Sequence, residues 1–375
     1  MKQIIGLAGV AVFALGACSE APEQVEVTTA TKVTSMEAKG TWIKDESGNV
    51  MADPQTSALT VWEGKLVSLS DASAGADMQR RLHFIDPKTA TVTSDEEKMR
   101  IGTTVRRSCF SGYLADAPDL EALVADPAQP GVFYTVTEDA TRTGALSVRC
   151  QQRYQNTGST DYPSLLVRLE RHEFGTTMTG VRPLQFPLSL KVGDYPNDGI
   201  EGLAMSADNT LYLGLEKDAA GQPRIFSLTL DDDFWDTTDF VPVEDPGFAV
   251  PVFDSGNHPL NGLAWYAGEG EQGYLLASAR NDNELWVIST DPEKETKRIP
   301  LHFTAPASGD NCSTEERMDN ASIEGLTVLG NTLYLVNDPW KENYLKNIQC
   351  DSNKASYEAM APLLFSLPLD LAWFN

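Results

Sequence analysis

The sequence predicts an all-β fold: a five-bladed β-propeller of four-stranded antiparallel blades. A short motif, Ile-Glu-Gly-Leu in its clearest copies, recurs five times, and each copy precedes a strand-like run that ends in aspartate. The copies lie at 56–59, 120–123, 200–203, 260–263 and 323–326. Their spacing of 64, 80, 60 and 63 residues is typical of a supersecondary unit that is repeated and stacked. Because the second copy is longer, a six-bladed ring is the alternative.

Within each copy, short runs of β-branched and aromatic residues alternate with turn residues, the pattern of antiparallel strands. In the third copy these runs are 202–206, 211–216 and 224–230, with a fourth within 240–253. In the fourth copy they are 263–266, 274–279, 284–289 and 296–303. We therefore expect four strands in each blade.

The fifth copy lacks a fourth run, since the sequence ends soon after its third run at 363–367. A run at 25–36, near the N-terminus, belongs to no copy. Pairing of these two parts would close the ring and remove two exposed sheet edges, which otherwise promote aggregation. The sequence thus predicts that an N-terminal strand completes the fifth blade.

The N-terminus has the features of a targeting segment. Lys2 precedes an apolar stretch at 4–15, which is too short to span a bilayer. The sequence Leu-Gly-Ala-Cys at 15–18 resembles the lipobox of bacterial lipoproteins. We expect a signal peptide at 1–17, a lipidated Cys18 with a flexible tether to residue 30, and one propeller domain at 31–375. The alternative is an ordinary secretory peptide with an incidental cysteine.

The residue after this cysteine, Ser19, matches the sorting pattern of outer-membrane lipoproteins. The expected location is therefore the bacterial cell envelope, at the outer membrane facing the periplasm. The net charge of −25 would repel nucleic acid and anionic membrane surfaces. We expect no nucleic-acid partner, and membrane contact only through the lipid. The oligomeric state is not predicted.

Four further cysteines in an exported chain predict two disulfides. In a four-stranded blade, the start of the inner strand and the turn between the second and third strands lie on the same face. Cys109 and Cys150 occupy these places in the second copy, and Cys312 and Cys350 occupy them in the fifth. Of the three connectivities, we expect Cys109–Cys150 and Cys312–Cys350.

The same topology gathers acidic residues at one end of the channel. The starts of the inner strands carry Glu121, Glu201 and Glu324, with Asn261 and Ser57 in register. The second strands end on that face with Asp71, Glu138, Asp139, Glu216, Asp218, Asp282 and Asp338. Converging carboxylates raise one another's pKa unless a cation neutralises them, and hard oxygen ligands suit Ca²⁺.

The candidate calcium ligands are therefore Glu121, Glu201, Glu324 and Asn261. The alternative is that these acids accept backbone hydrogen bonds or form Asx turns.

Basic residues follow the second strands on this face, at Arg142, Lys217, Arg280 and Lys341. Beside a metal ion such groups can bind phosphate oxygens, so Arg142, Lys217 and Arg280 are candidate substrate-binding residues. The alternative is that they form ion pairs with the abundant surface acids. The sequence assigns no catalytic residue: it contains no Gly-x-Ser-x-Gly elbow, His-Glu-x-x-His site or P-loop.

Several of these segments resemble the phytase-like family, whose domain is described as having esterase-like activity of phytase. The segments are 120–123 with 135–139, 200–204 with 211–218 and 224–228, and the weaker copies 261–264 and 323–327. Calcium-dependent apyrases have similar Glu-Gly-Ile strand starts. The resemblance spans roughly residues 56–367 and implies an exported propeller that binds calcium and cleaves phosphoesters. Asn261 and Ser57 depart from the family's glutamate pattern.

We therefore expect an envelope-anchored, calcium-dependent hydrolase of a small phosphoester. The alternative is a non-catalytic binding or scaffold propeller with a structural central cation, whose partner is an envelope protein or glycan.

Overall fold

The structure is a computed structural model that describes residues 34–93, 98–138, 147–154, 164–192, 199–268, 273–309, 312–341 and 343–375. The chain divides into two compact units, Met1–Lys32 and Val33–Asn375, and every described residue belongs to the second. The predicted signal peptide, Cys18 and the tether lie outside the described residues. Among the helices of the described ranges, none has the length and apolar character needed to cross a bilayer.

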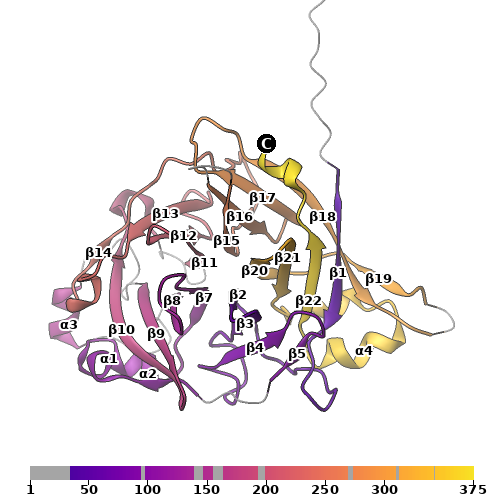
Figure 1. Cartoon of the computed structure of the whole chain (residues 1–375), viewed down its shortest axis with the longest axis horizontal. Coiled ribbons are helices and arrows are strands. Elements are labelled where there is room, and N and C mark those ends of the chain that lie inside the picture. The colour runs from indigo at the N-terminus through magenta and orange to yellow at the C-terminus, as the bar shows by residue number, and fades with distance from the viewer. Residues whose placement is uncertain are drawn as a thin grey trace, which may run out of the picture. The chain divides into compact units, whose positions relative to one another are not determined.

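Five blades surround a common centre, each with its first strand innermost (Figure 1). Blade 1 consists of β2 (Thr60–Trp62), β3 (Lys65–Leu69), β4 (Leu82–Asp86) and β5 (Thr91–Val92). Blade 2 consists of β7 (Leu120–Ala125), β8 (Val132–Thr137), β9 (Leu165–His172) and β10 (Gly175–Gln185). Blade 3 contains β11 (Ile200–Met205), β12 (Thr210–Leu215) and β13 (Arg224–Thr229).

Blade 4 consists of β15 (Leu263–Ala267), β16 (Gly273–Ala279), β17 (Glu284–Ser289) and β18 (Lys297–Pro306). Blade 5 contains β20 (Ile323–Leu329), β21 (Thr332–Asn337) and β22 (Leu363–Pro368), with β1 (Met36–Trp42) as its outer strand. The inner strands contact one another in the order β2, β7, β11, β15 and β20, and β20 contacts β2 again. The ring is therefore closed, and the predicted five-bladed propeller is confirmed.

Short elements fill the connections. Strands β6 (Arg100–Ile101) and β14 (Val241–Pro242) pair with β10, and β19 (Glu315–Met318) pairs with β18. The helices are α1 (Thr103–Arg107), α2 (Ser111–Ala115), α3 (Val148–Arg153) and α4 (Asp351–Glu358), with 3₁₀ turns η2 (Leu188–Leu190), η3 (Phe234–Asp236), η4 (Tyr344–Asn347) and η5 (Leu371–Phe374). In the described part of the second copy, the extra length holds α3 and the long β9–β10 hairpin rather than a sixth blade.

The closing strand is shifted from its predicted position at 25–36, of which only 34–36 is described. Strand β1 pairs antiparallel with β22 and runs parallel to β18, joining blades 4 and 5 into one sheet. Ala38 and Trp42 of β1 are buried in the core between them. Gly40 permits this close fit, since a Cβ there would lie 2.8 Å from the Thr304 carbonyl oxygen.

The prediction of four strands per blade is wrong for blade 3. Its expected fourth run, within 240–253, forms only an isolated bridge between Glu244 and Ser227, and β14 pairs with β10 of blade 2 instead. Pro242, Pro246 and Pro251 interrupt this run, and proline has no N–H to donate to a ladder.

Both predicted disulfides are confirmed. Cys109 bonds to Cys150 and Cys312 bonds to Cys350, with Cα–Cα distances of 5.8 and 5.9 Å. Each bond ties the segment before an inner strand to the connection between the second and third strands of the same blade.

Candidate functional site

In three blades, a β-bulge occurs where the inner strand begins. In β7 the pairing register shifts between Glu121 and Leu123, so that Ala122 is the extra residue. In β11 and β20 the extra residue is the glutamate itself, Glu201 or Glu324. A bulge bends its strand and re-aims a side chain, here toward the mouth of the channel. In β11 and β20 a glycine follows the glutamate and lets neighbouring inner strands approach, since a Cβ at Gly202 would lie 2.8 Å from the backbone nitrogen of Leu263 in the next blade.

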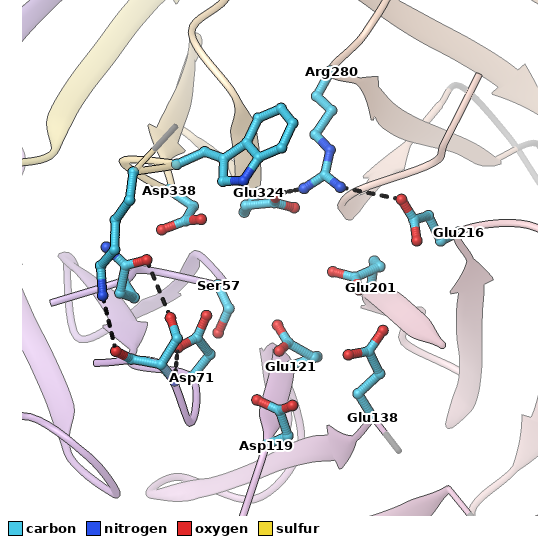
Figure 2. Close-up of a pocket in the computed structure, with 14 residues that line it drawn as sticks. Ser57, Asp71, Asp119, Glu121, Glu138, Glu201, Glu216, Arg280, Glu324 and Asp338 are labelled. Atoms are coloured by element: carbon cyan, nitrogen blue, oxygen red, sulfur yellow. Dashed lines mark hydrogen bonds and ion pairs between the residues drawn. The ribbon is translucent and has the colours of Figure 1, made fainter. Parts of the chain in front are cut away.

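These glutamates line one pocket of about 310 Å³ at this end of the channel (Figure 2). Its carboxylates are Asp71, Asp119, Glu121, Glu138, Glu201, Glu216, Glu324 and Asp338. Its other lining residues are Gln55, Ser57, Ser73, Arg280, Trp340 and Lys341. Eight acidic side chains thus face two basic ones, and no histidine or cysteine of the described ranges lines the pocket. Figure 2 shows the labelled carboxylates converging from different blades.

Some predicted acids do not reach the pocket. Asp218 accepts hydrogen bonds from the backbone of Ala220 and Gln222 and pairs with Arg224 at 2.7 Å, so it forms the Asx turn considered as the alternative. Asp282 contacts His258 Nδ1 at 2.9 Å instead. Both lie in the turn beyond the strand end, where the chain has already left the channel. Asp139 is outside the described residues.

Asn261, a predicted metal ligand, does not line the pocket either. Strand β15 begins only at Leu263, and its pairing with β16 has no bulge to turn Asn261 into the channel mouth. The Asn261 side chain is fully buried, and neither its amide nitrogen nor its oxygen has a hydrogen-bond partner in the described part of the chain.

Of the predicted phosphate-binding residues, the structure places Arg280 in the pocket. Its guanidinium forms ion pairs with Glu324 and, at 3.2 Å, with Glu216. Lys217 does not line the pocket, because successive side chains of an extended chain point to opposite sides and Glu216 takes the inward position. Lys217 instead contacts Asn257 at 3.5 Å. Arg142 lies outside the described residues.

Burial is the main cause of raised pKa values in this pocket, and neighbouring carboxylates add to it. It raises the pKa of Glu138 to about 8 and that of Asp71 to about 6. The pKa of Glu324 is raised by burial to about 7, although Arg280 opposes the rise. Burial also raises the pKa of Glu121, Glu201 and Asp338 well above the ordinary range. Without cations, the pocket therefore retains protons near neutral pH.

The donor set fits a calcium ion. Two groups of three carboxylates lie close enough to share an ion: Asp119, Glu121 and Glu138, and Glu138, Glu201 and Glu216. Every ligand atom offered is a hard oxygen, the type that Ca²⁺ prefers. In addition, Glu324 Oε2 is buried with no hydrogen-bond partner among the described residues, which indicates an unmet need for a positive group.

Sequence reasoning missed four residues of the pocket: Gln55, Ser73, Asp119 and Trp340. Asp119 precedes the second copy of the motif and has no counterpart in the other copies, so the repeat gave no signal for it. Trp340 follows the end of the second strand in blade 5 and is 47% exposed. The signal in the sequence is the Asp-Pro-Trp-Lys run at 338–341, which places a tryptophan in a polar turn just after a second strand. An exposed tryptophan beside a polar cavity is typical of a binding surface.

The fold and the pocket define a five-bladed β-propeller with a polyacidic site at one mouth of its channel. No protein-family model matches the chain, and no curated protein matches it. Solved structures with a similar arrangement include a GH43 β-1,3-galactosidase with galactodeoxynojirimycin, at 12% identity and a TM-score of 0.47, with 89% of this chain and 95% of that chain covered.

A glycosyl hydrolase from Bacteroides ovatus is similar at 12% identity and a TM-score of 0.43, covering 88% of this chain and 87% of that one. A Penicillium chrysogenum α-L-arabinanase complexed with arabinobiose is similar at 11% identity and a TM-score of 0.36, covering 85% and 75%. These structures are glycoside hydrolases rather than phytases, and at such values they carry no conclusion about the activity of this chain.

Proposed function

We propose that this protein binds calcium in the acidic pocket and hydrolyses a small phosphoester there, as the phytase-like resemblance implies. The observation that carries the proposal is the convergence of eight carboxylates on one pocket beside Arg280 and Lys341. Buried like charges at this density are unfavourable unless protons or cations neutralise them. Bound cations would also reverse the local field, so that the pocket attracts anions.

Calcium in the pocket would polarise a phosphoryl oxygen and lower the pKa of a bound water. Glu121 and Glu201 are the proposed ligands taken over from the sequence. Glu324, also a predicted ligand, belongs to neither group of three carboxylates. Its ion pair with Arg280 holds the guanidinium at the pocket. Arg280 is 30% exposed and can donate to the remaining phosphate oxygens. In the reaction the water oxygen bonds to phosphorus, the ester P–O bond breaks, and the leaving oxygen takes up a proton.

The location remains part of this proposal. We propose that Cys18 carries a lipid and that the propeller works in the bacterial envelope, as the lipobox-like sequence indicates. Expression in a bacterial host tests this: the intact protein should fractionate with membranes, and Cys18→Ala should release it. If the intact protein and the Cys18→Ala variant both stay with the membranes, or both are released, lipid anchoring at Cys18 would be contradicted.

A second candidate function is carbohydrate binding without phosphoester chemistry. It is favoured by Trp340, whose indole is 47% exposed at the pocket. Its backbone is fixed, since the amide donates to the Asp338 carbonyl at 2.8 Å and the carbonyl accepts from Tyr344 at 2.9 Å. A rigid, exposed aromatic face can stack on the apolar face of a sugar ring.

The deciding experiment assays the purified protein on a chromogenic phosphoester and on inositol phosphates, with calcium and with chelator. We expect calcium-dependent turnover that Glu201→Gln abolishes without changing the circular dichroism spectrum. The control is Glu63→Gln, which removes the same charge from an exposed residue at the opposite mouth of the channel. If calcium raises the melting temperature but no ester is cleaved, the protein is a binding module and the hydrolase proposal is wrong.

A further inference from the structure

We infer that the pocket binds two divalent cations, preferentially calcium, and that the carboxylate of Glu138 bridges them. The inference rests on the proposed calcium binding and specifies its stoichiometry and ligands. One site consists of Asp119, Glu121 and Glu138, and the other of Glu138, Glu201 and Glu216. Glu138 belongs to both.

The spacing of the oxygens matches the size of the ion. In each group, one carboxylate oxygen per residue lies within 4.8 Å of the others. Because Ca²⁺–oxygen distances are about 2.3–2.6 Å, oxygens on opposite sides of one ion are about 4.6–5.2 Å apart. Three oxygens that all lie within this separation can contact a single ion. Neither group requires a rearrangement of the backbone.

An independent observation comes from Glu121. This side chain is only 7% exposed and points into the pocket, yet no donor in the described ranges hydrogen-bonds its carboxylate (Figure 2). A buried carboxylate without a donor is unfavourable unless a cation compensates it. Glu121 therefore indicates an ion on the Asp119 side of Glu138. This position lies apart from Arg280, which forms ion pairs with Glu216 and Glu324.

The position of Glu138 suits a carboxylate that contacts both proposed ions. It lies at the end of the second strand of blade 2, and its Oε1 accepts a 3.2 Å hydrogen bond from the Gly199 amide of blade 3. This contact sets its carboxylate between the acids of blade 2, Asp119 and Glu121, and those of blade 3. Two-metal phosphoester hydrolases hold their ions about 3.5–4 Å apart, a separation that a single carboxylate could bridge.

The local charge is consistent with two ions. The two groups together contain five carboxylates, and one of them, Glu216, faces the guanidinium of Arg280, which Glu324 shares. Two divalent ions carry four positive charges, so together with this shared arginine they balance five ionised carboxylates in a largely buried site.

Calcium titration of chelator-treated protein by isothermal calorimetry tests the inference. We expect two ions per chain for the unaltered protein and for the Glu63→Gln control. Glu121→Gln and Glu201→Gln should each retain one ion, because each belongs to one group. Glu138→Gln should weaken both sites, by about 100-fold. These variants should fold without metal, since each relieves repulsion among like charges; circular dichroism checks this.

The outcomes separate this inference from the proposed function. One ion per chain, lost in both Glu121→Gln and Glu201→Gln, would overturn the bridged pair and leave calcium binding intact. Two ions that persist in all three variants would mean that the sites lie elsewhere, and would also overturn it. No calcium binding at all would overturn the proposed function with it.

Discussion

The backbone amide of Gly199 donates a 3.2 Å hydrogen bond to the side chain of Glu138, although the two residues belong to different blades. Glu138 follows the second strand of blade 2, and Gly199 precedes the inner strand of blade 3. The contact makes one continuous acidic wall from two repeats. It also requires a glycine, because a Cβ at position 199 would lie 2.4 Å from Glu138 Cγ.

Substituting Gly199 should therefore weaken calcium binding at the proposed site, although Gly199 is not itself a ligand. We expect Gly199→Ala to push Glu138 aside and to weaken calcium binding by about tenfold, as changes behind a metal ligand do. Calorimetric titration measures the effect. The matched control is Gly112→Ala in α2, where a Cβ would meet no atom within 4 Å. Equal calcium affinities in the two variants would show that Glu138 needs no such support.

The stability of the metal-free protein should fall as pH rises from about 5 to about 8. The pKa of Glu138 rises from 4.5 to about 8 on folding and that of Asp71 from 3.8 to about 6, so the native state binds more protons than the unfolded state in this range. Protonation therefore favours folding below these values, and this stabilisation is lost as pH rises through them. We expect the melting temperature in chelator to drop by about 5 °C or more.

Saturating calcium should remove this slope, because ions replace the protons as compensating charge. Melting curves at pH 5, 6, 7 and 8, with calcium and with chelator, give both dependences. A metal-free melting temperature that is constant or increases over this range would be inconsistent with the raised pKa values.

Arg280 should contribute to stability as well as to substrate binding. Arg280→Gln leaves Glu216 and Glu324 without their ion-pair partner, and both carboxylates are buried. We expect a loss of about 2 kcal/mol in the free energy of unfolding in chelator. Denaturant titration measures it. Arg298→Gln is the control, since Arg298 is 42% exposed and its ion pair with Glu284 should be worth less than about 1 kcal/mol. Equal losses in the two variants would contradict a special role of Arg280.

Trp340 should matter for ligand binding but not for folding. We expect Trp340→Ala to raise KM for the substrate, or Kd for a glycan, by about tenfold, because the exposed indole supplies contact area to a bound ring. Its melting temperature should stay unchanged. Phe174→Ala is the control, because Phe174 is 68% exposed on the β9–β10 hairpin and does not line the pocket. If Trp340→Ala lowers the melting temperature but leaves ligand binding unchanged, Trp340 contributes to folding rather than to ligand binding.

Much of the fold was predictable from local pattern. The spacing of the five motif copies determines the number of blades, and alternation of apolar residues with turns determines the strands. The disulfides followed from topology, because Cys109 and Cys150 hold places in one blade that must share a face. The prolines at 242, 246 and 251 were visible too, and they explain why the fourth strand of blade 3 is missing.

What the sequence by itself determined, then, is the repeat and the end of the channel where its glutamates gather, because both depend on residues close together in the chain. Only the tertiary structure decided which side chains enter the pocket. Bulges turn Glu121, Glu201 and Glu324 inward while Asn261 stays in the core, and strand alternation selects Glu216 over Lys217. The pairing of Arg280 with Glu324 and of Gly199 with Glu138 joins different blades, and such contacts depend on how the blades pack rather than on the period of the repeat.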